Sequence, residues 1–222
     1  MSYIPELYDF LGQLALNNNR PWFAAHRAEY DRLRELWLAD LDRLIAEMCR
    51  WCPQLAHQTA RSAVYRIYRD TRFSPDKTPF KTYFSAAISP YGRKSDHAGF
   101  YIQIGVDQRQ SGLYGGLWCP QAPVLAKLRH AIVDNIEEFT AITDAPELER
   151  EFPGWLGDKL KTIPKGWEKD HPQAEFLRLK EYGRFHPCTP EFFADPDWYI
   201  HASELFRILA PLVDFLNYSI DE

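Results

Sequence analysis

Four segments with strand-like sequence, joined by short turns, lie between residues 64 and 118. They span residues 64–68, 80–89, 100–106 and 111–118. In the third segment, from Phe100 to Val106, apolar residues alternate with polar or smaller ones, as expected for a strand with one buried face. The fourth contains Gly112, Gly115 and Gly116, which indicate a bulge or a close backbone approach. Parallel strands require long crossover connections, so the short turns predict an antiparallel meander.

Helical periodicity flanks this meander on both sides. Apolar residues recur every three or four positions in the segments 5–16, 21–49, 123–142 and 190–220, and residues 146–160 hold one or two shorter helices. The run Asn17-Asn18-Asn19 ends the first helix, and Pro21 suits the first turn of the second. A basic and aromatic segment at 177–187 predicts a fifth strand.

No internal repeat or low-complexity linker divides the 222 residues, so we expect a single α+β domain over residues 1–222. Its mainly antiparallel sheet of about five strands would be flanked by helices from both ends of the chain. The expected parts are a helical hairpin (1–52), the meander (61–118), helices (123–160), a strand (177–187) and C-terminal helices (190–220).

The charge distribution singles out one stretch, from Arg61 to Thr82. It holds six basic residues and two acids, which gives it a net charge of +4 in a chain whose net charge is −5. The basic residues are Arg61, Arg66, Arg69, Arg72, Lys77 and Lys81. Such a cluster in an acidic protein requires either internal carboxylates or an external anion.

Two interpretations of this stretch stay open, with a protein-partner surface as a third. Asp70 and Asp76 could pair with the arginines in an internal lattice that pins a long loop. Alternatively, Arg66, Arg69, Arg72, Lys77 and Lys81 could bind an anion, since a guanidinium offers a planar fork to phosphate or carboxylate. The side chains of Tyr68, Phe73 and Phe80 could then stack on a base or ring.

Two histidines are candidates for proton transfer. His26 lies near the start of the long helix expected after Pro21, where it could face the basic stretch. His171 follows Asp170, and an acid beside an imidazole can orient it. Each residue has a structural alternative, as a hydrogen-bonded helix histidine or as a surface loop residue.

Four motifs carry a more specific signal: NNNRPWFAAHR (17–27), YRIYRDTRFSPDKTPFKT (65–82), GGLW (115–118) and PKGWEKDHP (164–172). Over nearly the whole chain, the sequence resembles the family catalogued as domain of unknown function 2461. Phe80 stands where many members have tyrosine, which argues against a role that needs a phenol there. The resemblance names no catalytic residue. It implies that the signature positions are occupied by Asn18, Arg20, Trp22, Phe23, His26, Arg66, Arg69, Asp70, Arg72, Phe73, Asp76, Lys77, Pro79, Lys81, Gly116 and His171.

The expected function is a binding or enzymatic pocket for an anionic, phosphorylated small molecule. Its floor would be formed by Arg66, Arg69, Arg72, Lys77 and Lys81, and Asp76 is a further expected ligand-binding residue. Asn18, Arg20 and His26 would approach from the helix junction, and the aromatic lining would be Trp22, Tyr68, Phe73 and Phe80. If chemistry occurs, His26 or Asp70 would transfer protons while the cations stabilise charge on the substrate. Nucleic-acid binding on the same surface is the second hypothesis, and a structural module without a ligand is the third.

Several other classes are disfavoured. The chain has no GxxxxGK[ST], GxGxxG, HExxH or GxSxG motif, and we expect no cofactor. Cys49 and Cys52 form a CxxC at the end of a helix, where the dipole does not favour a thiolate, and no paired ligands accompany them, so we expect no metal. The acidic balance argues against a general nucleic-acid coat. Because no run of 18 apolar residues and no signal-peptide pattern is present, we expect no membrane partner and a cytoplasmic location.

Overall fold

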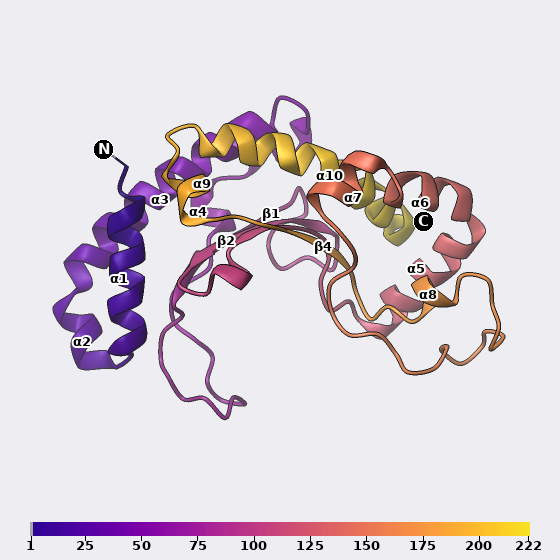
Figure 1. Ribbon diagram of the computed structural model, residues 1–222, viewed down its shortest axis with the longest axis horizontal. Coiled ribbons are helices and arrows are strands. Elements are labelled where there is room, and N and C mark those ends of the chain that lie inside the picture. Colours follow the sequence, from indigo (N-terminus) through magenta and orange to yellow (C-terminus); the bar gives the residue numbers. More distant parts are fainter. Residues whose placement is uncertain (1) are drawn as a thin grey trace. The chain divides into compact units, whose positions relative to one another are not determined.

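The computed structural model describes residues 2–222 (Figure 1). The chain has an α+β fold, as predicted, with helices before and after one antiparallel sheet. Its elements are α1 (Ile4–Leu16), α2 (Arg20–Ala25), α3 (Arg27–Met48), η1 (Pro53–His57), α4 (Ala60–Ala63), β1 (Tyr83–Ile88), β2 (Gly99–Gly105), η2 (Gln108–Gln110), β3 (Gly112–Leu117), α5 (Ala122–Asp134), α6 (Ile136–Thr143), α7 (Pro146–Glu151), α8 (Ala174–Leu177), β4 (Tyr182–Pro187), α9 (Pro190–Ala194) and α10 (Trp198–Asp221).

The sheet has the order β1-β2-β3-β4, so each strand pairs with its neighbour in sequence. Within residues 2–222 it has four strands and not the five expected, because residues 64–68 form only isolated antiparallel bridges. Val64 bridges Ala86 and Tyr68 bridges Phe80. Four residue steps on one side therefore face six on the other, and a regular ladder cannot form across this mismatch.

Two helices predicted as continuous are each broken once, at His26 and at Asn135. In both cases the backbone N–H and a side-chain nitrogen of the breaking residue contact the same carbonyl four residues earlier. His26 uses the carbonyl of Trp22 (3.1 and 2.8 Å), and Asn135 uses that of Ala131 (3.0 and 2.9 Å). The side chain thereby takes up the carbonyl as a C-terminal cap would, and the helix ends there.

The chain forms two compact units, each assembled from segments that are separate in sequence. The first comprises residues up to Arg93, Tyr101–Leu113 and Pro187–Glu204. The second comprises Lys94–Phe100, Tyr114–His186 and Leu205–Glu222. None of the helices in residues 2–222 combines the length and the apolar character needed to cross a membrane.

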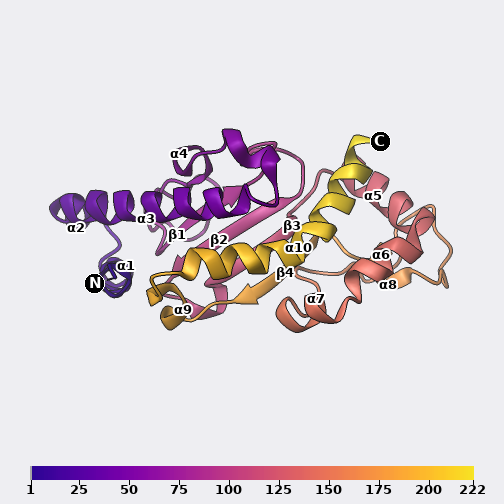
Figure 2. The ribbon, with the colours of Figure 1, turned by 90° about the horizontal axis from the view of Figure 1, so that it is seen from above.

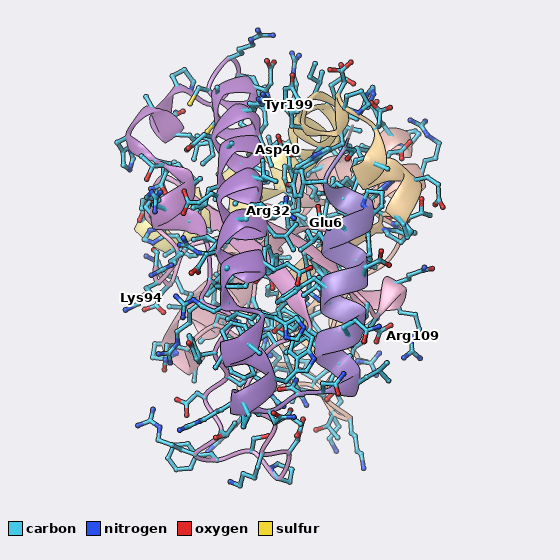
Figure 3. All side chains as sticks on the ribbon, turned by 90° about the vertical axis from the view of Figure 1, so that its left-hand side faces the viewer. Glu6, Arg32, Asp40, Lys94, Arg109 and Tyr199 are labelled. Carbon is cyan, nitrogen blue, oxygen red and sulfur yellow. The ribbon has the colours of Figure 1, made fainter. Side chains whose placement is uncertain are left out.

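The core of the first unit forms between α1, α3 and the sheet. Leu7 and Leu11 of α1 and Trp37 of α3 are fully buried. An ion pair between Glu6 and Arg32 joins the two helices on their exposed side (Figure 3). The indole of Trp37 stacks at 5.7 Å on that of Trp198, the first residue of α10. Figure 2 shows the ribbons of α3 and α10, which carry these two residues. The Trp37 ring centre also lies 6.5 Å from that of Phe84 in β1, so aromatic packing joins α3 to the sheet as well.

In the second unit, contacts within the fold account for Arg184, the arginine of strand β4. Arg184 is 2% exposed, and its guanidinium lies 4.5 Å from the centre of the Trp155 ring. It pairs with Glu149 and donates to the carbonyls of Phe152 (3.0 Å) and Thr143 (3.1 Å). This buried charge is compensated within the fold, so it is a structural arginine.

Gly116 is required where β3 meets β4. Its φ is +122°, and a Cβ there would lie 2.0 Å from the carbonyl oxygen of Tyr182. The strained backbone and the clash should together lower the free energy of unfolding of Gly116→Ala by at least about 2 kcal/mol. Urea denaturation would measure the loss.

Gly12→Ala is the matched control, because a Cβ on Gly12 in α1 meets nothing within 4 Å. Removing a glycine from a helix interior should raise stability by about 0.5–1 kcal/mol. Equal unfolding midpoints for the two variants would contradict this account of Gly116.

Candidate anion-binding site

Asn18, in the turn between α1 and α2, holds the end of the basic stretch in place. Its Nδ2 donates to the carbonyl of Phe80 at 2.9 Å, and its Oδ1 accepts from the Phe80 N–H at 3.0 Å. The carboxamide therefore pairs with Phe80 as a strand would. The Phe80 side chain is 2% exposed and stacks on Phe23 at 4.1 Å. Both Asn18 and Phe80 thus have structural contacts that account for them.

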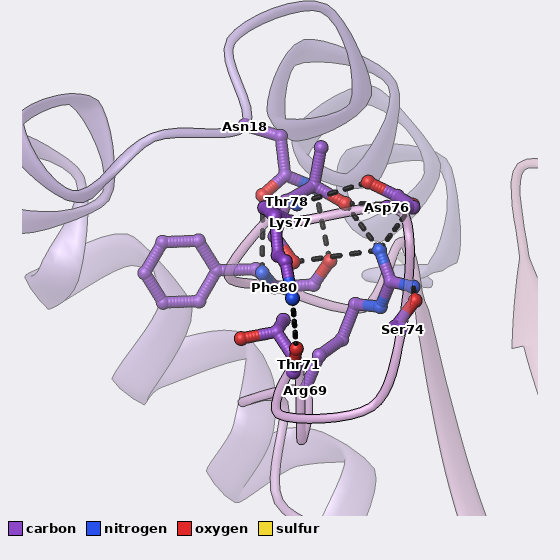
Figure 4. A network of polar contacts seen from close by, with 8 residues as sticks. All are labelled: Asn18, Arg69, Thr71, Ser74, Asp76, Lys77, Thr78 and Phe80. Atoms are coloured by element: carbon purple, nitrogen blue, oxygen red, sulfur yellow. Dashed lines mark hydrogen bonds and ion pairs between the residues drawn. The ribbon is translucent and has the colours of Figure 1, made fainter.

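Arg69 lies at the centre of a polar network within the loop (Figure 4). Its guanidinium contacts the Asp76 carboxylate and the Thr78 hydroxyl, and lies 3.5 Å from Ser74 Oγ. Asp76 also accepts from the Thr78 N–H at 2.9 Å. This backbone hydrogen bond, followed by the one from Arg69, lowers the pKa of Asp76 to about 2. The charge of Arg69 is therefore compensated inside the loop.

Arg72 and Asp70 form a second pair. The guanidinium donates from Nε at 3.0 Å and from a terminal nitrogen at 2.7 Å, so the contact is bidentate. These hydrogen bonds, together with one from the Arg72 N–H, lower the pKa of Asp70 to about 2. A carboxylate held in the ionised form in this way is a weak base, which counts against Asp70 as a proton acceptor near neutral pH.

A third arginine, Arg61, pairs with Glu35 at 2.7 Å. Three of the six basic side chains are thus neutralised, and Arg66, Lys77 and Lys81 remain. The ammonium of Lys77 donates to the carbonyl of Thr71 at 2.8 Å, which satisfies one hydrogen but compensates no charge (Figure 4).

Lys81 differs from the other cations in being half-buried. Its ammonium lies 5.1 Å from the ring centre of Tyr65 and 5.5 Å from that of Tyr83. Burial, and then the charge of Arg66, lower its pKa below the ordinary value. Neither Lys81 nor Arg66 forms an ion pair with any residue of the described chain, 2–222.

Sequence reasoning missed several neighbours of Lys81. Arg93 lies with its guanidinium 5.8 Å from the Tyr65 ring centre and donates to the carbonyl of Val64. The Tyr65 hydroxyl in turn donates to the carbonyl of Arg93 at 3.2 Å. Tyr83 and Tyr101 lie on the two adjacent strands β1 and β2. The alternation of side chains along these strands is the sequence signal from which the two tyrosines could have been predicted.

The helix junction brings fewer residues to the basic stretch than the sequence predicts. The His26 ring stacks on Trp22 at 3.9 Å, and its Nδ1 lies 2.8 Å from the Trp22 carbonyl. No hydrogen bond or ion pair joins His26 to Asp70 or Asp76 within residues 2–222. Arg20 is exposed at the start of α2. The two residues suggested for proton transfer, His26 and Asp70, are therefore not brought into contact.

Two exposed aromatic residues lie along the loop. Phe73 is 94% exposed, with the Arg72 guanidinium 5.8 Å from its ring centre. Tyr68 is half-exposed, and its hydroxyl accepts from Arg27 at 3.4 Å. Both are accessible to a ligand, whereas Phe80 is not.

His171 belongs to the second unit, whereas the residues of the candidate site described above belong to the first. Its ring packs edge-on to Trp167 at 5.1 Å, and its Nδ1 accepts from the Gln173 N–H at 3.2 Å. This arrangement matches the structural alternative for a loop histidine.

The cysteines are all free thiols. Burial raises the pKa of Cys49, which follows the last turn of α3. Cys119 has a positive φ of 45°, and its N–H lies 3.3 Å from Oε2 of the buried Glu181, a pair that sequence reasoning missed. Across residues 2–222, no three cysteine, histidine or acidic side chains gather as metal ligands would.

Replacing Asn18 should show how far the stretch depends on its carboxamide. Asn18→Ala leaves the buried N–H and the carbonyl of Phe80 without partners, which should cost about 1–3 kcal/mol of unfolding free energy. Asn17→Ala removes only an exposed contact to Gln13, so it should change stability by less than about 0.5 kcal/mol. Indistinguishable urea midpoints for the two variants would contradict the proposed role of Asn18.

The Arg69–Asp76 pair should contribute more to the stability of the fold than the Arg72–Asp70 pair does. Arg69→Met removes a guanidinium that is 26% exposed and serves several acceptors, so stability should fall by about 1–2 kcal/mol. Arg72→Met removes one that is 76% exposed, and the unfolding midpoint should hardly move. Thermal unfolding of both variants makes the comparison, and a larger loss for Arg72→Met would reverse the assignment.

Comparison with known proteins gives one match. The family model described as Conserved hypothetical protein (DUF2461) matches residues 6–215, which confirms the resemblance inferred from the motifs. No curated protein and no solved structure matches the chain significantly.

Proposed function

The chain belongs to the DUF2461 family, and we propose that it binds a phosphorylated small molecule through Lys81 and Arg66. One observation carries the proposal. The half-buried ammonium of Lys81 lies beside two tyrosine rings and close enough to Arg66 to be affected by its charge, and neither cation has a carboxylate partner in residues 2–222.

The electrostatics of this arrangement favour an anion. Two like charges raise the free energy of the unoccupied site, and partial burial reduces the hydration that would offset it. The ammonium has three hydrogens, and rings stabilise a cation less directionally than oxygen acceptors do. A phosphate group would supply the missing acceptors and opposite charge to both residues at once.

The paired arginines then have a supporting role. The contacts of Arg69 with Asp76 and Thr78 hold the loop that leads back to Lys81. Arg72 is bound to Asp70 at the exposed part of that loop. The expected set of ligand-binding cations therefore contracts to Arg66 and Lys81, with Lys77 as an exposed charge nearby in sequence.

Nucleic-acid binding remains a second candidate because of one feature, the exposed Phe73 ring beside Arg72. Exposed aromatic and cationic side chains suit single strands, on which bases stack. Such binding should weaken with salt, at a logarithmic slope of roughly −0.7 per phosphate contacted. A flat response to salt would remove this candidate.

Lys81→Met tests the primary proposal, because it keeps an unbranched side chain and removes only the charge. Inorganic pyrophosphate is the probe, and calorimetry at low ionic strength is the measurement. Loss of a charge-assisted contact should weaken binding roughly tenfold or more. Arg61→Met is the control, since Arg61 already pairs with Glu35, and its affinity should match that of the natural protein.

Two results would contradict the proposal. One is the absence of pyrophosphate binding at millimolar concentration in the natural protein. The other is an equal loss of affinity in Lys81→Met and Arg61→Met, which would show that only net charge matters.

A further inference from the structure

The sheet next to Lys81 presents a face of polar and aromatic side chains. Alternation along β2 places Tyr101 and Gln103 on one side of the strand, with Gly105 after them. A Cβ on Gly105 would lie 2.5 Å from the Cβ of Tyr83, so the side chain of Tyr83 in β1 rises from this same face. Apolar Phe100, Ile102 and Ile104 occupy the buried opposite side.

Tyr65 extends this face toward the cations. Its ring centre lies 6.1 Å from that of Tyr101. The Lys81 ammonium lies within 5.5 Å of both the Tyr65 and the Tyr83 ring centres. Hydrogen bonding of the Tyr65 hydroxyl to the Arg93 carbonyl fixes the ring. Three tyrosine rings and an uncompensated ammonium thus form one continuous surface within the first unit.

Gln103 supplies an unused donor on this surface. The residue is only 7% exposed, and its Oε1 accepts from the Tyr101 hydroxyl at 2.8 Å. That bond directs the oxygen of the carboxamide toward Tyr101 and leaves the N–H groups free to donate. No residue among 2–222 accepts a hydrogen bond from them. The Nε2 atom of Gln103 keeps some exposure to solvent, so a ligand that supplies an acceptor can take the place of water there.

We infer that the ligand is a nucleoside phosphate, whose base lies against the tyrosine rings while its phosphate contacts Lys81. A carbonyl oxygen or ring nitrogen of the base would accept from the Gln103 amide. This inference rests on the proposed anion site and adds the class of ligand to it. An aliphatic phosphate would leave both the rings and the amide unused, whereas a flat heterocycle with acceptors uses both.

The test compares ligands on the natural protein, so it does not depend on a variant that folds. Calorimetry with adenosine monophosphate, uridine monophosphate and ribose 5-phosphate at one salt concentration isolates the base. At least one nucleotide should bind roughly tenfold tighter than ribose 5-phosphate, as expected for one stacked base. Equal affinity for all three would overturn the inference, while loss of that binding in Lys81→Met would still support the anion site.

Variants at two positions locate the base. Gln103→Leu should reduce the preference for the nucleotide several-fold and leave ribose 5-phosphate unchanged. Tyr83→Leu should do the same, whereas Tyr83→Phe keeps the ring and should retain the preference. A preference unaffected by both leucine variants would overturn the placement of the base. Tighter binding of a single-stranded oligonucleotide than of any mononucleotide would overturn the choice of a small-molecule ligand.

Failure of the proposed function itself would look different. In that case neither the nucleotides nor ribose 5-phosphate would bind, and Lys81→Met would behave as the natural protein does.

Discussion

The pairing of the Asn18 carboxamide with both backbone groups of Phe80 is the contact on which the site depends. It ties the turn after α1 to a segment more than sixty residues later, where the strand ladder is irregular. With its backbone held, the Phe80 side chain packs into the core against Phe23. The next residue, Lys81, is thereby placed on the other side of the chain, beside Tyr65 and Tyr83.

The loop between Tyr68 and Phe80 contains the two acids that could neutralise the basic stretch. Asp70 and Asp76 neutralise Arg72 and Arg69, so the loop has an internal lattice of ion pairs. The lattice does not extend to Arg66 or Lys81, which keep their charge without a partner in residues 2–222. The internal lattice therefore accounts for Arg69 and Arg72, and anion binding stays a proposal for Arg66 and Lys81. The arginines nearer the exposed end stabilise the loop, and the cations nearer the sheet are the ones we propose for binding.

Periodicity predicted the fold class because burial of one face leaves a repeat of two or of 3.6 residues in any sequence. It could not predict the helix breaks at His26 and Asn135, since these depend on a side chain reaching one particular carbonyl. The mismatch between residues 64–68 and 80–86 depends on the loop between them, which has no periodic signal. The contacts within the candidate site could not be predicted from the sequence, for a similar reason. Composition located the basic stretch, but a count of charges cannot say which arginine meets which acid. Gln103 escaped notice because it lies about twenty residues beyond Lys81 and joins its surroundings only through strand pairing.

The pKa of the Lys81 ammonium, in free and bound protein, tests the central claim most directly. It can be followed by NMR of isotopically methylated lysines, with the signal assigned through Lys81→Arg. Burial and Arg66 lower this pKa in the free protein, and an anion favours the charged form, so saturating pyrophosphate should raise it. A pKa equal to that of exposed lysines, and unmoved by pyrophosphate, would contradict the account.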